Sequence, residues 1–120
     1  VAINRQELQQ VLINLMVNAM QAMAGGNGMG DRERVLTLSM REAVDGAVCI
    51  DVADTGPGLD EATQAALFQP FFTTKRDGNG LGLWISRGLL ERYGGALRAA
   101  NRPVGDGPGA MFTVALTVGG

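Results

Sequence analysis

The feature that most restricts the fold is a stretch near the start of the chain, where apolar residues recur at steps of three and four. The apolar positions are Leu8, Val11, Leu12, Leu15, Met16, Ala19 and Met23. This period predicts a helix over residues 4–23, with Asn4 as its N-cap and Glu7 completing a capping-box pattern. Ile13, Val17 and Met20 widen the apolar face, which predicts that the helix is largely buried.

The rest of the chain must cover this helix, because 120 residues allow a single domain. Alternating residues predict strands over 35–41 and 47–53, joined by an Asp45-Gly46 hairpin. A short helix capped by Asp60 is expected over 60–67, then an irregular segment over 68–80 and a helix over 81–93 that ends at Gly94-Gly95. Strands over 97–101 and 110–118 follow. This order favours an antiparallel or mixed sheet covered on one face by helices.

Composition excludes several classes of function. The chain has no histidine, so it cannot supply a histidine base, ligand or phosphoacceptor. A single cysteine, Cys49, excludes an internal disulfide and a cysteine-cluster metal site. The net charge is 10 − 12 = −2 with the basic residues dispersed, which argues against nucleic acid as a partner. No apolar run approaches the ~18 residues of a membrane span, so we expect no membrane contact by this domain.

Polar side chains form a narrow stripe along the first predicted helix. Its members are Glu7, Gln10, Asn14, Asn18 and Gln21. Asn14 and Asn18 lie one turn apart and point the same way. A carboxamide oxygen is a neutral, hard ligand that suits Mg²⁺ when water and phosphate complete the coordination shell. The alternative is that both amides lie at the helix edge and bond water or a loop, which is the commoner situation for asparagine.

The second motif is Asp54-Thr55-Gly56-Pro57-Gly58, at the end of an apolar strand. An ionised aspartate only accepts hydrogen bonds, so a buried Asp54 suits the exocyclic amine of adenine and repels the carbonyl oxygen of guanine. Such a site would prefer ATP to GTP. The alternative is a simple turn that contains two glycines.

The third motif is Gly78-Asn79-Gly80-Leu81-Gly82-Leu83, at the start of the second long helix. Glycines let backbone N–H groups approach an anion, and a helix N-terminus favours negative charge, so a triphosphate would fit there. The loop lacks the preceding strand of a dinucleotide site and the Gly-Lys-Ser/Thr ending of a P-loop. A flexible hinge is the alternative.

The segment between these two motifs is rich in phenylalanine. Phe71 and Phe72 are placed to anchor a lid, and Lys75 and Arg76 to contact a terminal phosphate. The alternative is that the aromatic rings belong to the core and that the two cations are solvated.

The order and spacing of these motifs resemble the ATP-binding catalytic domain of bacterial sensor histidine kinases. That fold is shared with DNA gyrase B, the Hsp90 chaperones and the MutL repair proteins. The resemblance runs from Glu7 to about Leu116, and residues 12–19 are similar to the Asn box of the family. It implies an α/β two-layer sandwich of the Bergerat type, with a mixed, mainly antiparallel sheet covered on one face by helices.

The resemblance also implies roles for single residues. Asn18 would coordinate Mg²⁺, with Asn14 supporting the site, and Asp54 would recognise adenine. The other positions implied at ATP are Gly56 and Gly58 at the base pocket, Phe71 and Phe72 beside the lid, Lys75 and the loop residues Gly78, Gly80, Leu81 and Gly82 at the phosphates, and Thr113 on the adenine side. No residue is assigned as catalytic with certainty, and Asn14 and Lys75 are the candidates for support.

Asn14 discriminates within the superfamily that the resemblance names. Hydrolysing members carry a glutamate one turn before the Mg²⁺-binding asparagine, as a base for water. An amide cannot take a proton at neutral pH, so ATP bound here should await another acceptor. This favours a kinase over a chaperone or a gyrase-type ATPase, and a Ser/Thr protein kinase or an ATPase of the same superfamily is the alternative to a histidine kinase. A nucleotide-free interaction domain is a further alternative.

The resemblance sets expectations for the whole protein as well. Residues 1–120 would be one ATP-binding domain cut from a longer chain, with its N-terminal strand mostly missing. The acceptor histidine would lie on a separate dimerisation domain of a homodimeric parent, which would pass phosphate to a response regulator. The domain would be cytoplasmic, and the longer protein could be anchored in the inner membrane. A basic residue common in relatives three positions after Asn18 is here Gln21.

Overall fold

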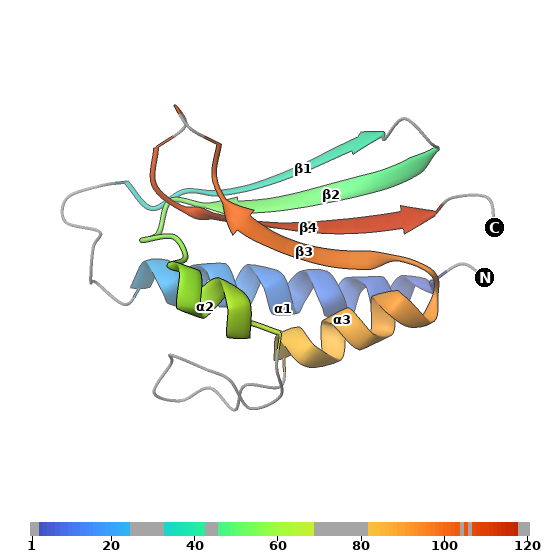
Figure 1. Ribbon diagram of the computed structural model, residues 1–120. Helices are drawn as coiled ribbons and strands as arrows, with labels where there is room; N and C mark the ends of the chain where they lie inside the picture. The colour runs from blue at the N-terminus through green and yellow to red at the C-terminus, as the bar shows by residue number, and fades with distance from the viewer. Residues whose placement is uncertain are drawn as a thin grey trace.

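The computed structural model describes residues 3–24, 33–42, 46–68, 82–103, 105 and 107–117. These residues form two layers, with a four-stranded sheet on one side and three helices packed against one of its faces (Figure 1). The strand order is β1-β2-β4-β3, and all three neighbouring pairs are antiparallel. The two-layer fold predicted from the sequence is confirmed, and every strand pair in the described chain is antiparallel.

The elements follow the predicted order closely. They are α1 (Arg5–Ala24), β1 (Leu36–Glu42), β2 (Ala47–Asp54), α2 (Glu61–Ala66), α3 (Gly82–Arg92), β3 (Ala96–Asn101) and β4 (Ala110–Thr117). Asn4 caps α1 by accepting a hydrogen bond from the Glu7 N–H at 2.8 Å, and Asp60 caps α2 by accepting from the Thr63 N–H at 2.7 Å. That bond from Thr63 lowers the pKa of Asp60. Both caps were predicted.

The two glycines at the end of α3 stop the helix as predicted. Gly94 has a φ of +79°, a left-handed conformation that favours glycine. The Gly95 N–H then donates to the Leu90 carbonyl at 2.8 Å, which closes the last turn. The chain therefore reverses here and enters β3 beside the helix that it has just left.

The core lies between the sheet and the helices. Its buried side chains are Val11 and Leu15 of α1, Ile50 and Val52 of β2, Phe112 and Val114 of β4, Leu97 of β3, Leu90 of α3, and Leu67 and Ala110. Alternate residues of β2 and β4 face this core, so residues of the other parity face away from the helices. This alternation decides which polar residues reach the site described below.

The prediction that α1 is largely buried is wrong. The buried residues form one stripe, Val11, Leu15, Ala19 and Met23, whereas Ile13, Val17 and Met20 are 49%, 39% and 50% exposed. In a two-layer fold a helix buries the side that faces the sheet and leaves the opposite side in water. These three side chains lie on that outer side, at positions about 140° or more around the helix from Leu15 by the ~100° turn per residue.

Candidate functional site

The candidate site centres on Asp54, the last residue of β2. Asp54 has the same parity as Ile50 and Val52, so its side chain lies on the helix side of the sheet. It is only 2% exposed. The apolar strand thus carries one carboxylate into the interior at the edge of the core.

The two oxygens of this carboxylate differ. Oδ1 accepts hydrogen bonds from the Gly56 N–H at 2.8 Å and from the Ala110 N–H at 3.2 Å. Oδ2 accepts no hydrogen bond from any residue that the structure describes. Burying a polar atom without a partner is costly, so an open oxygen in a nearly inaccessible place is suited to a ligand that donates a hydrogen bond.

Glycines let the loop after β2 fold back onto Asp54. A Cβ at Gly56 would lie 2.9 Å from Asp54 Oδ1, closer than real Cβ contacts come. Gly58 has a φ of +83°, and a Cβ there would lie 2.8 Å from Asn101 Oδ1. The two predicted glycines therefore fulfil different needs: Gly56 allows close approach to the carboxylate, and Gly58 allows a left-handed turn.

Asn101, at the end of β3, holds the same loop in place. Its Oδ1 accepts from the Leu59 N–H at 2.6 Å, and its Nδ2 donates to the Leu59 carbonyl at 2.9 Å. The wall of the site is thus a loop pinned to β3 by two hydrogen bonds. Sequence reasoning did not single out Asn101, because its partner is 42 residues away along the chain.

Asn14 lies on the side of α1 that faces α3. Its Oδ1 accepts from Gln10 Nε2 at 3.1 Å, and its Nδ2 donates to Ser86 Oγ on α3 at 3.1 Å. Asn18 follows one turn later and is partly buried. At Asn14 the polar stripe predicted on α1 therefore borders α3, and near the start of the stripe Tyr93, the residue after α3, donates to the Glu7 carboxylate. That bond raises the pKa of Tyr93.

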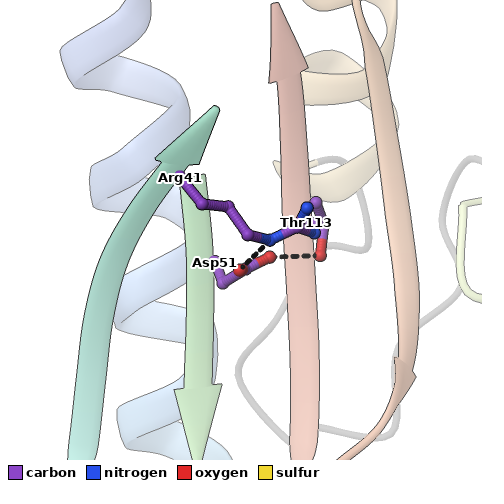
Figure 2. Close-up of polar contacts among 3 residues, drawn as sticks. All are labelled: Arg41, Asp51 and Thr113. Atoms are coloured by element: carbon purple, nitrogen blue, oxygen red, sulfur yellow. Dashed lines mark hydrogen bonds and ion pairs between the residues drawn. The ribbon is translucent and has the colours of Figure 1, made fainter. Parts of the chain in front are cut away.

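Thr113 does not join this site. It lies on the open face of the sheet, where its hydroxyl donates to Asp51 Oδ1 at 2.7 Å (Figure 2). Arg41 Nε contacts Asp51 Oδ2 at 2.9 Å from the other side. The residue of β4 that does meet Asp54 is Ala110, three positions earlier and of opposite parity, through its backbone N–H.

Asp51 is held in its ionised form by these contacts. Burial of the carboxyl by itself raises the pKa of Asp51, but the hydrogen bonds from Thr113 and Arg41 and the Arg41 charge outweigh it, so the pKa is lowered. The Asp51 hydrogen bond correspondingly raises the pKa of Arg41. The cluster joins β1, β2 and β4, and sequence reasoning missed it because each residue belongs to a different strand.

Several predicted site residues lie outside the described residues. These are Phe71, Phe72, Lys75, Gly78, Gly80 and Leu81. Gly82 is the first residue of α3, which agrees with the prediction that the Gly-rich run leads into a helix. The described part of the site is therefore the surroundings of Asp54 and the α1–α3 boundary at Asn14.

Two kinds of feature are absent from the described residues. No group of three or more His, Cys, Asp or Glu side chains converges there as a metal site. Among the helices of those ranges, none has both the length and the apolar character needed to cross a bilayer.

A family model settles what kind of domain this is. The model, described as histidine kinase-, DNA gyrase B- and HSP90-like ATPase, matches residues 3–119. The chain belongs to this family. The resemblance inferred from the motifs is thereby confirmed, and the relatives within the family include sensor histidine kinases.

Two curated relatives illustrate the similarity of this ATPase domain to such kinases. It is 42% identical over 113 residues to the sensor histidine kinase ZraS of Klebsiella oxytoca, covering 94% of this chain and 22% of that protein. It is 40% identical to the sensor protein FixL of Bradyrhizobium diazoefficiens, covering 94% and 21%. The chain thus spans about a fifth of the length of these relatives.

Solved structures of the family share the fold. The catalytic domain of histidine kinase ThkA, in a nucleotide-free form, is 32% identical with a TM-score of 0.75, covering 95% of this chain and 68% of that chain. Full-length ShkA in complex with AMPPNP is 32% identical with a TM-score of 0.74, covering 92% and 21%. This domain is therefore similar in both sequence and fold to catalytic domains of histidine kinases.

Proposed function

We propose that this domain binds Mg²⁺-ATP and presents the terminal phosphate to a histidine on a separate dimerisation domain. The observation that carries the proposal is the buried Asp54 carboxylate, whose Oδ1 is held by two backbone N–H groups and whose Oδ2 accepts nothing from the described residues. Membership of an ATPase family and a similar kinase bound to AMPPNP support ATP as the ligand.

Asp54 Oδ2 would accept a hydrogen bond from the amino group of adenine. An ionised carboxylate cannot donate, so guanine would set its carbonyl oxygen against a second acceptor and leave both groups unpaired in a dry pocket. Gly56 and Gly58 would shape the wall beside the base, because neither position has room for a side chain in its present conformation.

Mg²⁺ fits the donor set that α1 offers. A single carboxamide oxygen from Asn18, completed by waters and phosphate oxygens, is an ordinary arrangement for this ion. The ion would offset negative charge on the phosphates when bound. Asn14 would support the site, Lys75 would add positive charge, and Gly78, Gly80, Leu81 and Gly82 would line the triphosphate. Phe71 and Phe72 would flank a lid.

The domain's contribution to phosphoryl transfer is positioning and charge neutralisation. Asn14 is an amide whose oxygen and nitrogen already bond Gln10 and Ser86, so it cannot activate water as a base. Bound ATP should hydrolyse slowly. Because the chain has no histidine, the acceptor belongs to another part of the parent protein.

The parent protein is proposed to be a homodimeric, two-component sensor kinase that passes phosphate to a response regulator. The similar sensor kinases are about five times longer than this chain, which leaves room for a dimerisation domain and a sensor. We propose that the domain itself works in the cytoplasm, without contact to nucleic acid or membrane.

Ligand-dependent unfolding tests the proposal. Mg²⁺-ATP should raise the melting temperature of the domain and Mg²⁺-GTP should raise it far less, because a ligand that binds only the folded state stabilises it. ATP should remain intact during the measurement. Rapid steady hydrolysis would favour an ATPase instead, and the absence of any shift with ATP would favour an interaction domain that does not bind nucleotide.

A further inference from the structure

The two helices that border the proposed phosphate site are tied together by one buried hydroxyl. Ser86 on α3 is 0% exposed, and its Oγ accepts a hydrogen bond from Asn14 Nδ2 on α1 at 3.1 Å. Gln10 occupies the other end of the same amide by donating to Asn14 Oδ1 at 3.1 Å. Both polar ends of Asn14 are thus fixed, and its orientation is set by Ser86 and Gln10 together.

The place of this contact matters more than its strength. Ser86 lies one helical turn after Gly82, the residue at which α3 begins, and Asn14 lies one turn before Asn18. Each partner is therefore about 6 Å along its helix from a residue assigned above to the phosphates or to Mg²⁺. A hydroxyl is also a costly choice for packing alone at a fully buried position, where alanine would fill most of the space.

We propose that Ser86 is a positioning residue, which acts through Asn14 to hold the start of α3 against the Asn18 turn of α1. This inference rests on the proposed function. Ser86 does not touch the nucleotide; its hydrogen bond keeps the two helix segments in register so that the triphosphate meets both. The proposed adenine site at Asp54 is bounded by β2, its loop, β4 and the last turn of α1 at Ala22 and Met23. Asn14 lies eight residues before Ala22, about 12 Å along α1, so this site should not depend on the Ser86 contact.

The α1–α3 boundary contains its own control. Tyr93, the residue that directly follows α3, donates its hydroxyl to the Glu7 carboxylate of α1, which is a similar tie between the other ends of the same two helices. Glu7 lies 11 residues before Asn18, which is about 16 Å along α1. Removing the Tyr93 hydroxyl therefore weakens the helix contact without disturbing the end that is proposed to hold the phosphates.

The test compares two probes, Mg²⁺-ATP and adenosine, by titration of three proteins: the unsubstituted domain (called the parent below) and its Ser86→Ala and Tyr93→Phe variants. Ser86→Ala should weaken Mg²⁺-ATP binding by about three- to ten-fold, the loss expected for one hydrogen bond, and leave adenosine affinity within about two-fold. Tyr93→Phe should leave both affinities within about two-fold. Ser86→Cys, which keeps a weaker polar atom, should fall between the parent and Ser86→Ala.

Unfolding curves without ligand establish that each variant is folded, and Ser86→Cys carries the test if Ser86→Ala is not. Equal losses for ATP and adenosine, or the same ATP-specific loss in Tyr93→Phe, would overturn the inference by showing a general structural role. Normal ATP binding by Ser86→Ala would overturn it too, while leaving the proposed function intact. If the unsubstituted domain binds neither probe, both the proposed function and this inference are overturned.

Discussion

Two buried carboxylates on one strand differ in how their oxygens are hydrogen-bonded. Asp51 and Asp54 are three residues apart on β2, so they lie on opposite faces of the sheet. Asp51 is satisfied on both oxygens by the side chains of Thr113 and Arg41. Asp54 is more deeply buried, yet within the described chain its partners are two backbone N–H groups on a single oxygen.

This difference indicates that Asp51 has a structural role, whereas Asp54 is suited to bind a ligand. Asp51 has a side-chain partner on each oxygen, and these contacts join three strands. Asp54 is held by one oxygen, and no residue in the described ranges donates to the other, which is an arrangement suited to a specific hydrogen bond to a ligand. The distribution of its hydrogen bonds over the two oxygens, more than burial or charge, distinguishes the candidate binding residue.

The largest effect is expected for Asp54→Asn. The amide oxygen can still accept from Gly56 and Ala110, so the fold should persist, but the amide nitrogen then faces the adenine amino group donor to donor. We expect Mg²⁺-ATP affinity to fall about 10- to 100-fold, which corresponds to a lost hydrogen bond to a charged group. Calorimetric titration measures this. An Asp54→Asn protein that binds ATP as tightly as the parent would refute the assignment.

Asp51→Asn should give the converse result. The neutral amide loses the ion pair with Arg41 and part of the bonding to Thr113, so the free energy of unfolding should fall by about 1–3 kcal/mol. ATP affinity should stay within about two-fold of the parent, because the open face of the sheet lies away from Asp54. Denaturant unfolding and titration of the same sample test both statements, and a large loss of ATP binding would break the comparison.

The smallest expected effect is a change, at acid pH, in the stability difference between the unsubstituted domain and Asp51→Asn. The pKa of Asp51 is lowered in the folded protein, so its contribution to stability is present above the ordinary aspartate pKa of about 3.9 and is lost as pH falls through the folded value. The stability gap between the parent and Asp51→Asn should therefore narrow below about pH 4. Unfolding at a series of pH values measures this stability gap. A gap that widened in acid would contradict a lowered pKa of Asp51.

Much of the fold was predictable because local signals and tertiary structure agree. Asn4, Asp60 and Gly94 mark helix ends through short-range hydrogen bonds and backbone preference, and each has the predicted role. The exposed side of α1 was not predictable from its period, since Ile13 and Val17 extend the apolar face but the sheet covers only one side of the helix.

The site was partly predictable for the same reason. Residue type was enough to predict Asp54, Gly56 and Gly58 as site residues. The Ala110 N–H could not be predicted in this way, because it is a backbone group that any residue except proline would carry. Thr113 shows the sensitivity of strands to parity: its resemblance-based assignment pointed to the adenine side, but an odd offset from Ala110 moves its side chain to the opposite face.

The central claim is that Asp54 accepts a hydrogen bond from the adenine amino group. The most direct measurement compares the affinity of ATP with that of purine riboside triphosphate, which lacks only this amino group, in the parent and in Asp54→Asn. We predict that the parent binds ATP at least about ten-fold more tightly and that the preference disappears in the variant. Equal affinities of the two nucleotides for the parent protein would contradict the account.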